Sequence, residues 1–321
     1  MNKQTSAKLQ LCISMIIFGT IGLFSRSVHV SSGELALYRA LMAAVLLAGF
    51  FLVTKKKLDR EAVKKELWPL LFSGMAMGVN WILLFEAYKH TTISVATLSY
   101  YFAPVLVTIL CPILFKEKLT AKQILCFVMS TVGLAMVILF EAPEAGMEAA
   151  KAGAEVATWS VSANGVSGLL ADWLGSGSHL LGIFFGLGAA CFYATVILLN
   201  KRIKGVEGIQ RTFVQFLAAI LILAPYVACT SGVQLGKLDG AGWVCLLILG
   251  VVHTGITYCM YFSSLKELKG QEVSILSYLD PLVAVLASVL ILGEQMSLPQ
   301  LLGGVLILGF TLWNELGNQT T

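Results

Sequence analysis

Residues 278–294 have the sequence YLDPLVAVLASVLILGE, an apolar run that opens with an aspartate set directly against a proline. In a lipid bilayer an ionised Asp280 is costly, and such residues usually face the interior of a helix bundle. Pro281 cannot donate a backbone hydrogen bond, and its ring frees the carbonyl of Ser277. In lipid a freed carbonyl is tolerated only beside protein partners or a cavity. The run therefore predicts a membrane helix that borders an interior site.

The rest of the chain is similarly apolar. Of its 321 residues, 57% are hydrophobic and only 12% are charged, and the mean hydropathy is +0.83. A soluble domain has about 25% charged residues, and a helix that spans the bilayer needs roughly 20 apolar residues. We therefore expect an all-α, multi-pass protein of the cell (cytoplasmic) membrane. The ten predicted transmembrane helices are 9–27, 34–53, 68–88, 92–115, 121–140, 179–199, 212–230, 241–263, 270–292 and 298–315.

The positive charges predict the orientation of these helices, because cytoplasmic loops are rich in Lys and Arg. With the N-terminus inside, the cytoplasmic segments carry 17 Lys and Arg residues and the other side carries four. Six of the 17 lie in the loop 54–67, TKKKLDREAVKKEL. Both termini are therefore expected to be cytoplasmic. The net charge of +4 reflects this bias and does not indicate a nucleic-acid partner.

The chain divides into two halves around its longest connection. Residues 141–178, rich in Ala, Gly and Ser, are predicted to be an extracytoplasmic linker. Residues 1–140 and 179–321 then hold five helices each. An odd number forces the second half to enter the membrane from the opposite face, so repeats of this kind have inverted topology, as in many transporters.

The two halves also match each other at fixed spacing. The segment YFAPVLVTILCPILFKE (101–117) aligns with 278–294, and a tryptophan begins the third and the eighth helix. The loop after Glu117 carries lysines that the loop after Glu294 lacks, as expected if the two loops lie on opposite sides. The matched pairs are Tyr101 with Tyr278, Pro104 with Pro281, Glu117 with Glu294, Gln123 with Gln300 and Trp68 with Trp243.

Each five-helix half has a proline-containing helix, an acidic residue thirteen positions later and a Gly-rich last helix (STVGLAMVIL, LLGGVLILG). In these features the chain resembles the EamA-type members of the drug/metabolite transporter superfamily. The resemblance implies a secondary carrier or exporter of small metabolites, amino acids among them, that needs no ATP. In agreement, the sequence contains no GxxxxGK[ST] phosphate-binding motif. No cofactor is expected.

Asp280, Pro104 and Pro281 are the central candidates for a site. Two prolines at equivalent depths predict two helix hinges around a midplane cavity. Asp280 has Ala103 as its counterpart in the first half. It is therefore expected to serve either as a counter-charge for a substrate ammonium or as a proton-titrating group, with a hydrogen-bonded structural carboxylate as the alternative.

Other polar and aromatic residues at similar depth complete the predicted site. Their hydroxyl, amide, imidazole and ring faces suit an amphipathic solute. Arg39, by contrast, is expected to snorkel to the outer interface, where it can pair with Glu34. The predicted substrate-binding residues, besides Asp280, are Asn80, Trp81, Tyr100, Tyr101, His253, Thr254, Ser277 and Tyr278.

The leading functional hypothesis is a secondary transporter that moves an amino acid or a related amphipathic metabolite, with export as the expected direction, by alternating access. The alternative is a proton-coupled exporter of cationic drugs, which requires a titrating carboxylate. A membrane sensor or scaffold is less favoured, as is an enzyme, because no catalytic set or metal cluster is evident in the sequence. The expected partners are a small-molecule substrate, the lipid bilayer and, in the alternative, protons; neither monomer nor homodimer is favoured.

Overall fold

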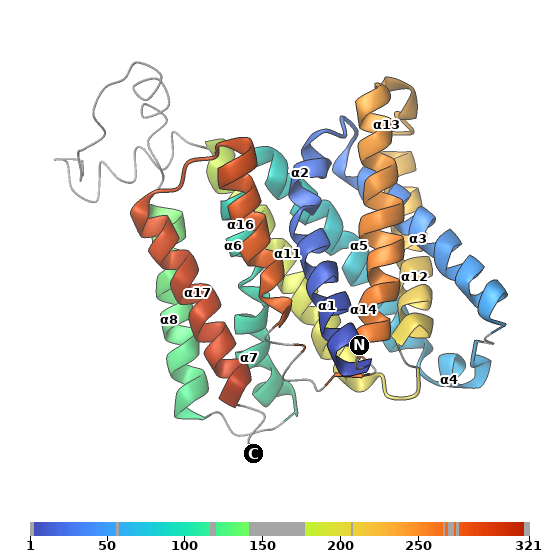
Figure 1. The fold of residues 1–321 in the computed structure, drawn as a ribbon, viewed down its shortest axis with the longest axis horizontal. Helices are drawn as coiled ribbons and strands as arrows, with labels where there is room; N and C mark the ends of the chain where they lie inside the picture. Colours follow the sequence, from blue (N-terminus) through green and yellow to red (C-terminus); the bar gives the residue numbers. More distant parts are fainter. Residues whose placement is uncertain are drawn as a thin grey trace.

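The structure is a computed structural model that describes residues 3–55, 58–115, 120–140, 177–206, 208–265, 267–268, 273 and 276–317. Its regular structure in these ranges is entirely helical (Figure 1). Residues 141–176 of the predicted linker therefore lie outside the described residues. Glu117 lies outside them as well.

Each predicted span overlaps at least one helix of the described residues. The first half contains α1 (Lys3–Gly19), α2 (Ile21–Arg26), α3 (Ser32–Thr54), α4 (Arg60–Lys65), α5 (Leu67–His90), α6 (Ile93–Tyr100), α7 (Ala103–Phe115) and α8 (Ala121–Leu139). The second half contains α11 (Gly177–Arg202), α12 (Gly208–Cys229), the short 3₁₀ helix η1 (Leu235–Lys237), α13 (Gly240–Leu247), the π-helix η2 (Ile248–Ile256), α14 (Thr257–Leu265), α16 (Leu279–Leu292) and α17 (Leu298–Gly317).

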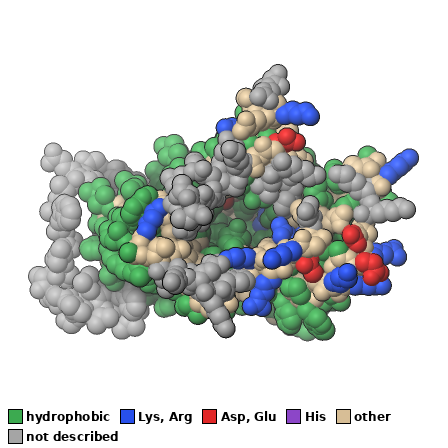
Figure 2. Space-filling view, turned by 90° about the horizontal axis from the view of Figure 1, so that it is seen from below, with side chains coloured by type: hydrophobic (Ala, Val, Ile, Leu, Met, Phe, Trp, Pro, Cys, Tyr) green, Lys and Arg blue, Asp and Glu red, His purple; other side chains and the backbone are tan. Residues whose placement is uncertain are grey.

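Length and hydropathy make the molecule a multi-pass membrane protein. Among the described residues, eight helical stretches are long and apolar enough to cross a bilayer, and Leu279–Leu292 and Leu298–Asn314 are shorter apolar helices. Aliphatic side chains such as Leu52, Val53 and Leu290 are more than three-quarters exposed, as expected for a surface that faces lipid. Figure 2 shows many Lys and Arg side chains on the end of the molecule where α1 begins and α4 lies.

Three of the predicted spans are interrupted by non-helical residues, the ninth of them at Tyr278, just before α16. The first divides at Thr20, between α1 and α2, and the fourth divides at Tyr101 and Phe102, between α6 and α7. Pro104 and Pro281 each lie in the first turn of a new helix, α7 and α16. Proline is well tolerated there, because the first turn has no intrahelical partner for its N–H. Both prolines therefore mark points where a helix restarts.

The packing of the helices pairs segments from the two halves. α11 lies along α5, and α12 packs against both α3 and α5. At one edge of the bundle α8 and α17 lie side by side (Figure 1). A Cβ at Gly133 of α8 would lie 2.6 Å from the carbonyl oxygen of Gly303 in α17. The Gly-rich last helices therefore allow the backbones of the two halves to approach closely.

The π-helix η2 interrupts the eighth predicted span. Its wider turns leave backbone carbonyls that side chains five residues later also engage. Thr254 Oγ1 donates to Leu249 O (2.8 Å), Thr257 Oγ1 donates to Val252 O (2.8 Å), and His253 Nδ1 lies 3.2 Å from Ile248 O. π-Helical turns are frequent at functional sites, and this one presents His253 and Thr254 to the neighbouring helices.

Candidate functional site

Asp280 lies where the interrupted helices of the two halves meet. The Tyr101 hydroxyl, from the break between α6 and α7, donates to Asp280 Oδ2 at 2.5 Å. Asp280 is in the first turn of α16 and is partly buried. A Cβ at Gly19, just before the break between α1 and α2, would lie 2.6 Å from the Asp280 carbonyl oxygen. Three discontinuous segments therefore meet at Asp280, one at its carboxylate and one at its backbone carbonyl.

Aromatic rings lie next to the residues that contact Asp280. The ring centroid of Tyr100 lies 5.8 Å from that of Tyr101 and 5.3 Å from that of Tyr193 in α11. From the other side, the Phe18 ring meets Tyr258 edge-on at 5.2 Å. Tyrosine rings offer both apolar faces and hydroxyls, so this region suits a solute with an apolar body and a charged or polar group.

Tyr278 and Ser277 lie next to Asp280 in the chain, but the structure gives them different surroundings. Ser277 Oγ donates to the carbonyl of Val273, four residues earlier, at 2.8 Å. Its hydroxyl is therefore engaged by the local backbone. Tyr278 is partly buried at the start of α16.

His253 joins α1 and η2. Its Nε2 lies 2.9 Å from Thr20 Oγ1, and the Phe24 ring meets the imidazole at a centroid distance of 5.1 Å. Because Nδ1 contacts the carbonyl of Ile248, both ring nitrogens have protein partners. The side chain is 2% exposed. His253 therefore ties the break in the first span to the π-helix, and its contacts are those of a cross-link between helices.

Asn80 also makes a contact between helices. Its Nδ2 donates to the carbonyl of Ala189 in α11 at 2.7 Å, and the side chain is buried. The next residue, Trp81, is buried against Phe216 of α12, with ring centroids 5.6 Å apart. Of the predicted pair, Trp81 is therefore the one that joins the aromatic group, whereas the amide of Asn80 holds α5 to α11.

Arg39 differs most from its expected position. Instead of reaching the outer interface, it is 3% exposed, and its Nε donates to Thr254 Oγ1 in η2 at 3.0 Å. Its guanidinium carbon lies 5.4 Å from the Trp81 ring centroid and 5.1 Å from that of Phe85. Glu34 bonds elsewhere, to the Tyr38 hydroxyl and to the backbone N–H of Gln234. The one sequence signal for a role of Arg39 is its place within an otherwise apolar span.

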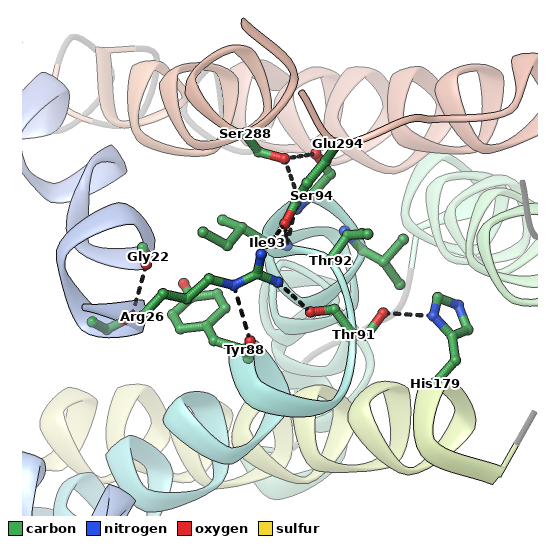
Figure 3. Close-up of polar contacts among 12 residues, drawn as sticks. Gly22, Arg26, Tyr88, Thr91, Thr92, Ile93, Ser94, His179, Ser288 and Glu294 are labelled. Atoms are coloured by element: carbon green, nitrogen blue, oxygen red, sulfur yellow. Dashed lines mark hydrogen bonds and ion pairs between the residues drawn. The ribbon is translucent and has the colours of Figure 1, made fainter. Parts of the chain in front are cut away.

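A second polar cluster lies where α2, α5 and α6 meet the C-terminal end of α16 (Figure 3). Arg26 Nη1 lies 2.6 Å from Glu294 Oε1, and Glu294 Oε2 accepts the backbone N–H of Ile93 at 2.9 Å. The hydroxyl of Ser288 also donates to this carboxylate. The acid thus sits at the N-terminus of α6, where the free N–H groups and the helix dipole favour an anion.

The backbone positions both partners of this pair. Gly293 ends α16 in a left-handed conformation with φ of 67°, which glycine adopts without strain, and so turns Glu294 back toward α6. Arg26 donates from Nη2 to the Thr91 carbonyl (2.7 Å) and from Nε to the Tyr88 carbonyl (3.2 Å). We call Arg26, Glu294 and the α6 N-terminus the end cluster; it joins α2, α5, α6 and α16.

Among the residues that the structure describes, no group of three or more His, Cys, Asp or Glu side chains lies together in a way that could hold a metal ion.

Comparison with known proteins agrees with this architecture. A model of the EamA-like transporter family matches residues 5–139 and 180–314. The uncharacterized transporter YxxF of Bacillus subtilis (strain 168) is 29% identical over 307 residues, which cover 95% of this chain and 88% of that protein. An uncharacterized transporter of Archaeoglobus fulgidus is 24% identical over 308 residues, which cover 95% of each of the two chains. One solved protein structure, 17% identical, shares the fold with a TM-score of 0.61 over 98% of each chain.

The predicted family and multi-pass membrane location are thus confirmed, and the family is one of transporters rather than enzymes. The chain belongs to the EamA-like transporter family of the drug/metabolite transporter superfamily.

Proposed function

We propose that the chain is a secondary transporter of an amino acid or a related amphipathic metabolite, which it exports across the cytoplasmic membrane. The observation that carries the proposal is the hydrogen bond between Tyr101 and Asp280, because it joins the helix breaks of the two halves at one charged, aromatic site. Sites of this kind, at discontinuous helices between inverted repeats, are typical of secondary transporters.

Alternating access supplies the mechanism of the proposal. Residues 1–140 and 179–321 would rock against each other around Asp280, with both termini on the cytoplasmic side. The end cluster lies at the opposite end of the bundle from the start of α1 (Figure 1). In this proposal the Arg26–Glu294 pair would hold the outer end closed while solute exchanges at the cytoplasmic end.

A proton-coupled exporter of cationic drugs is the second candidate. It is favoured by the aromatic rings around Asp280, since cations bind the faces of tyrosine rings as well as a carboxylate. In this version Asp280 releases a proton as it takes up the cation. The two candidates differ in whether a pH gradient drives accumulation.

The experiment that separates them is counterflow in proteoliposomes with labelled amino acids and lipophilic cations, with and without a pH gradient, for the wild type and Asp280→Asn. Exchange of an amino acid that ignores the gradient, and that the variant loses, supports the metabolite carrier. Accumulation of cations only with a gradient supports the drug exporter. Failure of every solute to move with folded wild-type protein contradicts both.

A further inference from the structure

Arg39 is a buried cation in the membrane-spanning helix α3, without a described counter-ion. It is 3% exposed, and none of the described carboxylates lies within ion-pair distance of its guanidinium. Burying an unpaired charge costs several kcal/mol, and in proteins such charges are normally paired. The Trp81 and Phe85 rings offset part of this cost. They cannot satisfy the hydrogen-bonding groups of the guanidinium.

Most N–H donors of the Arg39 guanidinium have no acceptor among the described residues. Arginine carries five N–H groups in a planar fork that matches a carboxylate with two parallel hydrogen bonds. The Nε–H of Arg39 is used by Thr254. The Nη groups make no hydrogen bond to any residue that the structure describes. The bond to Thr254 and the two rings fix the plane of the fork, and so pre-organise it for a planar anion.

Arg39 and Asp280 share one aromatic environment. A chain of ring contacts connects them. Arg39 lies over Trp81, whose ring is 5.6 Å from Phe216, and Phe216 is 5.4 Å from Tyr258. Tyr258 in turn meets Phe18, which precedes Gly19 beside the Asp280 carbonyl. The cation is supplied by α3 beside η2, and the carboxylate by α16 beside the break between α6 and α7. This aromatic group therefore has a guanidinium at one end and a carboxylate near the other.

We infer that Arg39 binds the carboxylate of the transported solute while Asp280 binds its ammonium, so that the substrates are zwitterions of the amino-acid class. This inference rests on the proposed transport function and narrows it, because a lipophilic cation has nothing to offer Arg39. Trp81 then has two roles, since it holds the guanidinium and presents its ring to the apolar part of the solute.

The competing explanation is purely structural: Arg39 would only brace α3 against η2 and α5 through Thr254 and the two rings. The two explanations differ in what they say about selectivity. A structural brace affects all solutes alike when it is weakened. A carboxylate ligand affects only solutes that carry a carboxylate.

The test compares matched pairs of probes that differ in that one group: L-leucine with isoamylamine, and L-phenylalanine with phenethylamine. Counterflow in proteoliposomes and thermal stabilisation of the purified protein are measured for the wild type, Arg39→Gln and Arg39→Lys. Arg60→Gln is the matched control, because Arg60 is an exposed arginine on α4. Thermal stabilisation reports binding separately from transport.

We expect the wild type and Arg60→Gln to prefer each amino acid over its amine. In Arg39→Gln this preference falls by at least about tenfold, or about 1.4 kcal/mol, with binding of the amines retained. Arg39→Lys falls in between, since lysine keeps the charge but loses the fork. If Arg39→Gln does not fold, the lysine variant carries the test, and an unchanged preference in it overturns the inference.

Other outcomes distinguish failure of the inference from failure of the proposed transport function. Equal exchange of amines and amino acids by the wild type overturns the inference and leaves transport intact. A uniform loss for all probes in Arg39→Gln does the same, since it shows a structural brace. If no probe exchanges in the wild type, the proposed function fails. The inference then stands only if amino acids stabilise the wild type but not Arg39→Gln, and falls if they stabilise neither.

Discussion

Arg26 of α2 and Glu294 beyond α16 form an ion pair of 2.6 Å at the N-terminus of α6, so that residues from opposite ends of the chain close one end of the bundle. The Glu294 side chain is only 8% exposed. A pair of this kind differs from an exposed one, because removal of one partner leaves the other charge poorly solvated.

Glu294→Gln is therefore expected to loosen this end. The backbone amides of Ile93 and Ser94 lose a charged acceptor, so their hydrogen exchange should accelerate, and the apparent melting temperature in detergent should fall. A double-mutant cycle with Arg26→Gln should give a coupling energy of about 1–3 kcal/mol. Glu61→Gln is the matched control, because the Glu61–Lys64 pair is exposed and such pairs contribute little. Equal effects of Glu294→Gln and Glu61→Gln on the melting temperature would argue against closure by the end cluster.

Tyr101→Phe removes the hydroxyl that donates to Asp280 and keeps the ring. A hydrogen bond to a charged group contributes about 1.5–3 kcal/mol, so counterflow should slow by roughly ten- to a hundredfold while the protein remains folded. Tyr226→Phe, on the half-exposed ring of α12, should leave transport unchanged. Wild-type rates in Tyr101→Phe would show that Asp280 acts without this partner.

Gly133→Ala tests the contact between α8 and α17. The added Cβ would meet the Gly303 carbonyl at 2.6 Å and Leu306 Cβ at 2.8 Å, which forces the helices apart at a cost of about 1–3 kcal/mol. Gly309→Ala, also on α17, meets nothing within 4 Å and should be neutral or slightly stabilising. Thermal unfolding in detergent compares the two. Similar melting temperatures would mean that the two helices do not need this close approach.

Glu66 provides a prediction with a pH dependence. Its carboxylate accepts the backbone N–H groups of Gly205, Lys204 and Val206, and these bonds, with that of Gly205 the strongest, lower its pKa. Because the folded-state pKa lies below the unfolded one, the stabilisation is complete above the unfolded pKa and disappears as pH falls through the folded value.

Glu66→Gln should therefore melt at a lower temperature than the wild type near pH 7. The expected loss in free energy of unfolding is about 1 kcal/mol, comparable to the loss of a helix cap. The difference should shrink as the pH is lowered and the wild-type carboxylate becomes protonated. A difference that is constant across the acidic range would mean that the charge of Glu66 is not what holds the loop.

The sequence predicted most of the helices because a helix that spans lipid must be apolar over a fixed length, whatever it packs against. The breaks were harder to predict. Pro104 and Pro281 marked two of them, but the break at Thr20 follows Gly19 in a run with no proline. A close approach to the Asp280 backbone explains the glycine, and only the folded structure shows that approach.

The site was predicted in part for a similar reason. Depth in the membrane identified Asp280 and Tyr101 separately, but their hydrogen bond depends on how the halves are placed. The sequence indicates Asn80 for its amide and Ser277 for the carbonyl that Pro281 frees, but it does not show that the Asn80 amide and the Ser277 hydroxyl each donate to a backbone carbonyl. Arg39 was misplaced because a long side chain can reach in either direction from its Cα, and the sequence does not show that Thr254 lies within reach.

The π-helix η2 has a consequence for the history of the chain. Trp68 and Trp243 lie 175 positions apart, whereas Tyr101 and Tyr278 lie 177 apart, so the second half has two more residues than the first between these landmarks. A helix with i→i+5 bonds holds roughly one residue more per turn than an α-helix, and η2 is nine residues long. The π-helix η2 can therefore accommodate the two additional residues within the membrane-spanning segment. If the halves arose by duplication, an insertion here would have given one copy His253 and Thr254 where the other has Met77 and Gly78, and with them a cross-link to Thr20 and a holder for Arg39.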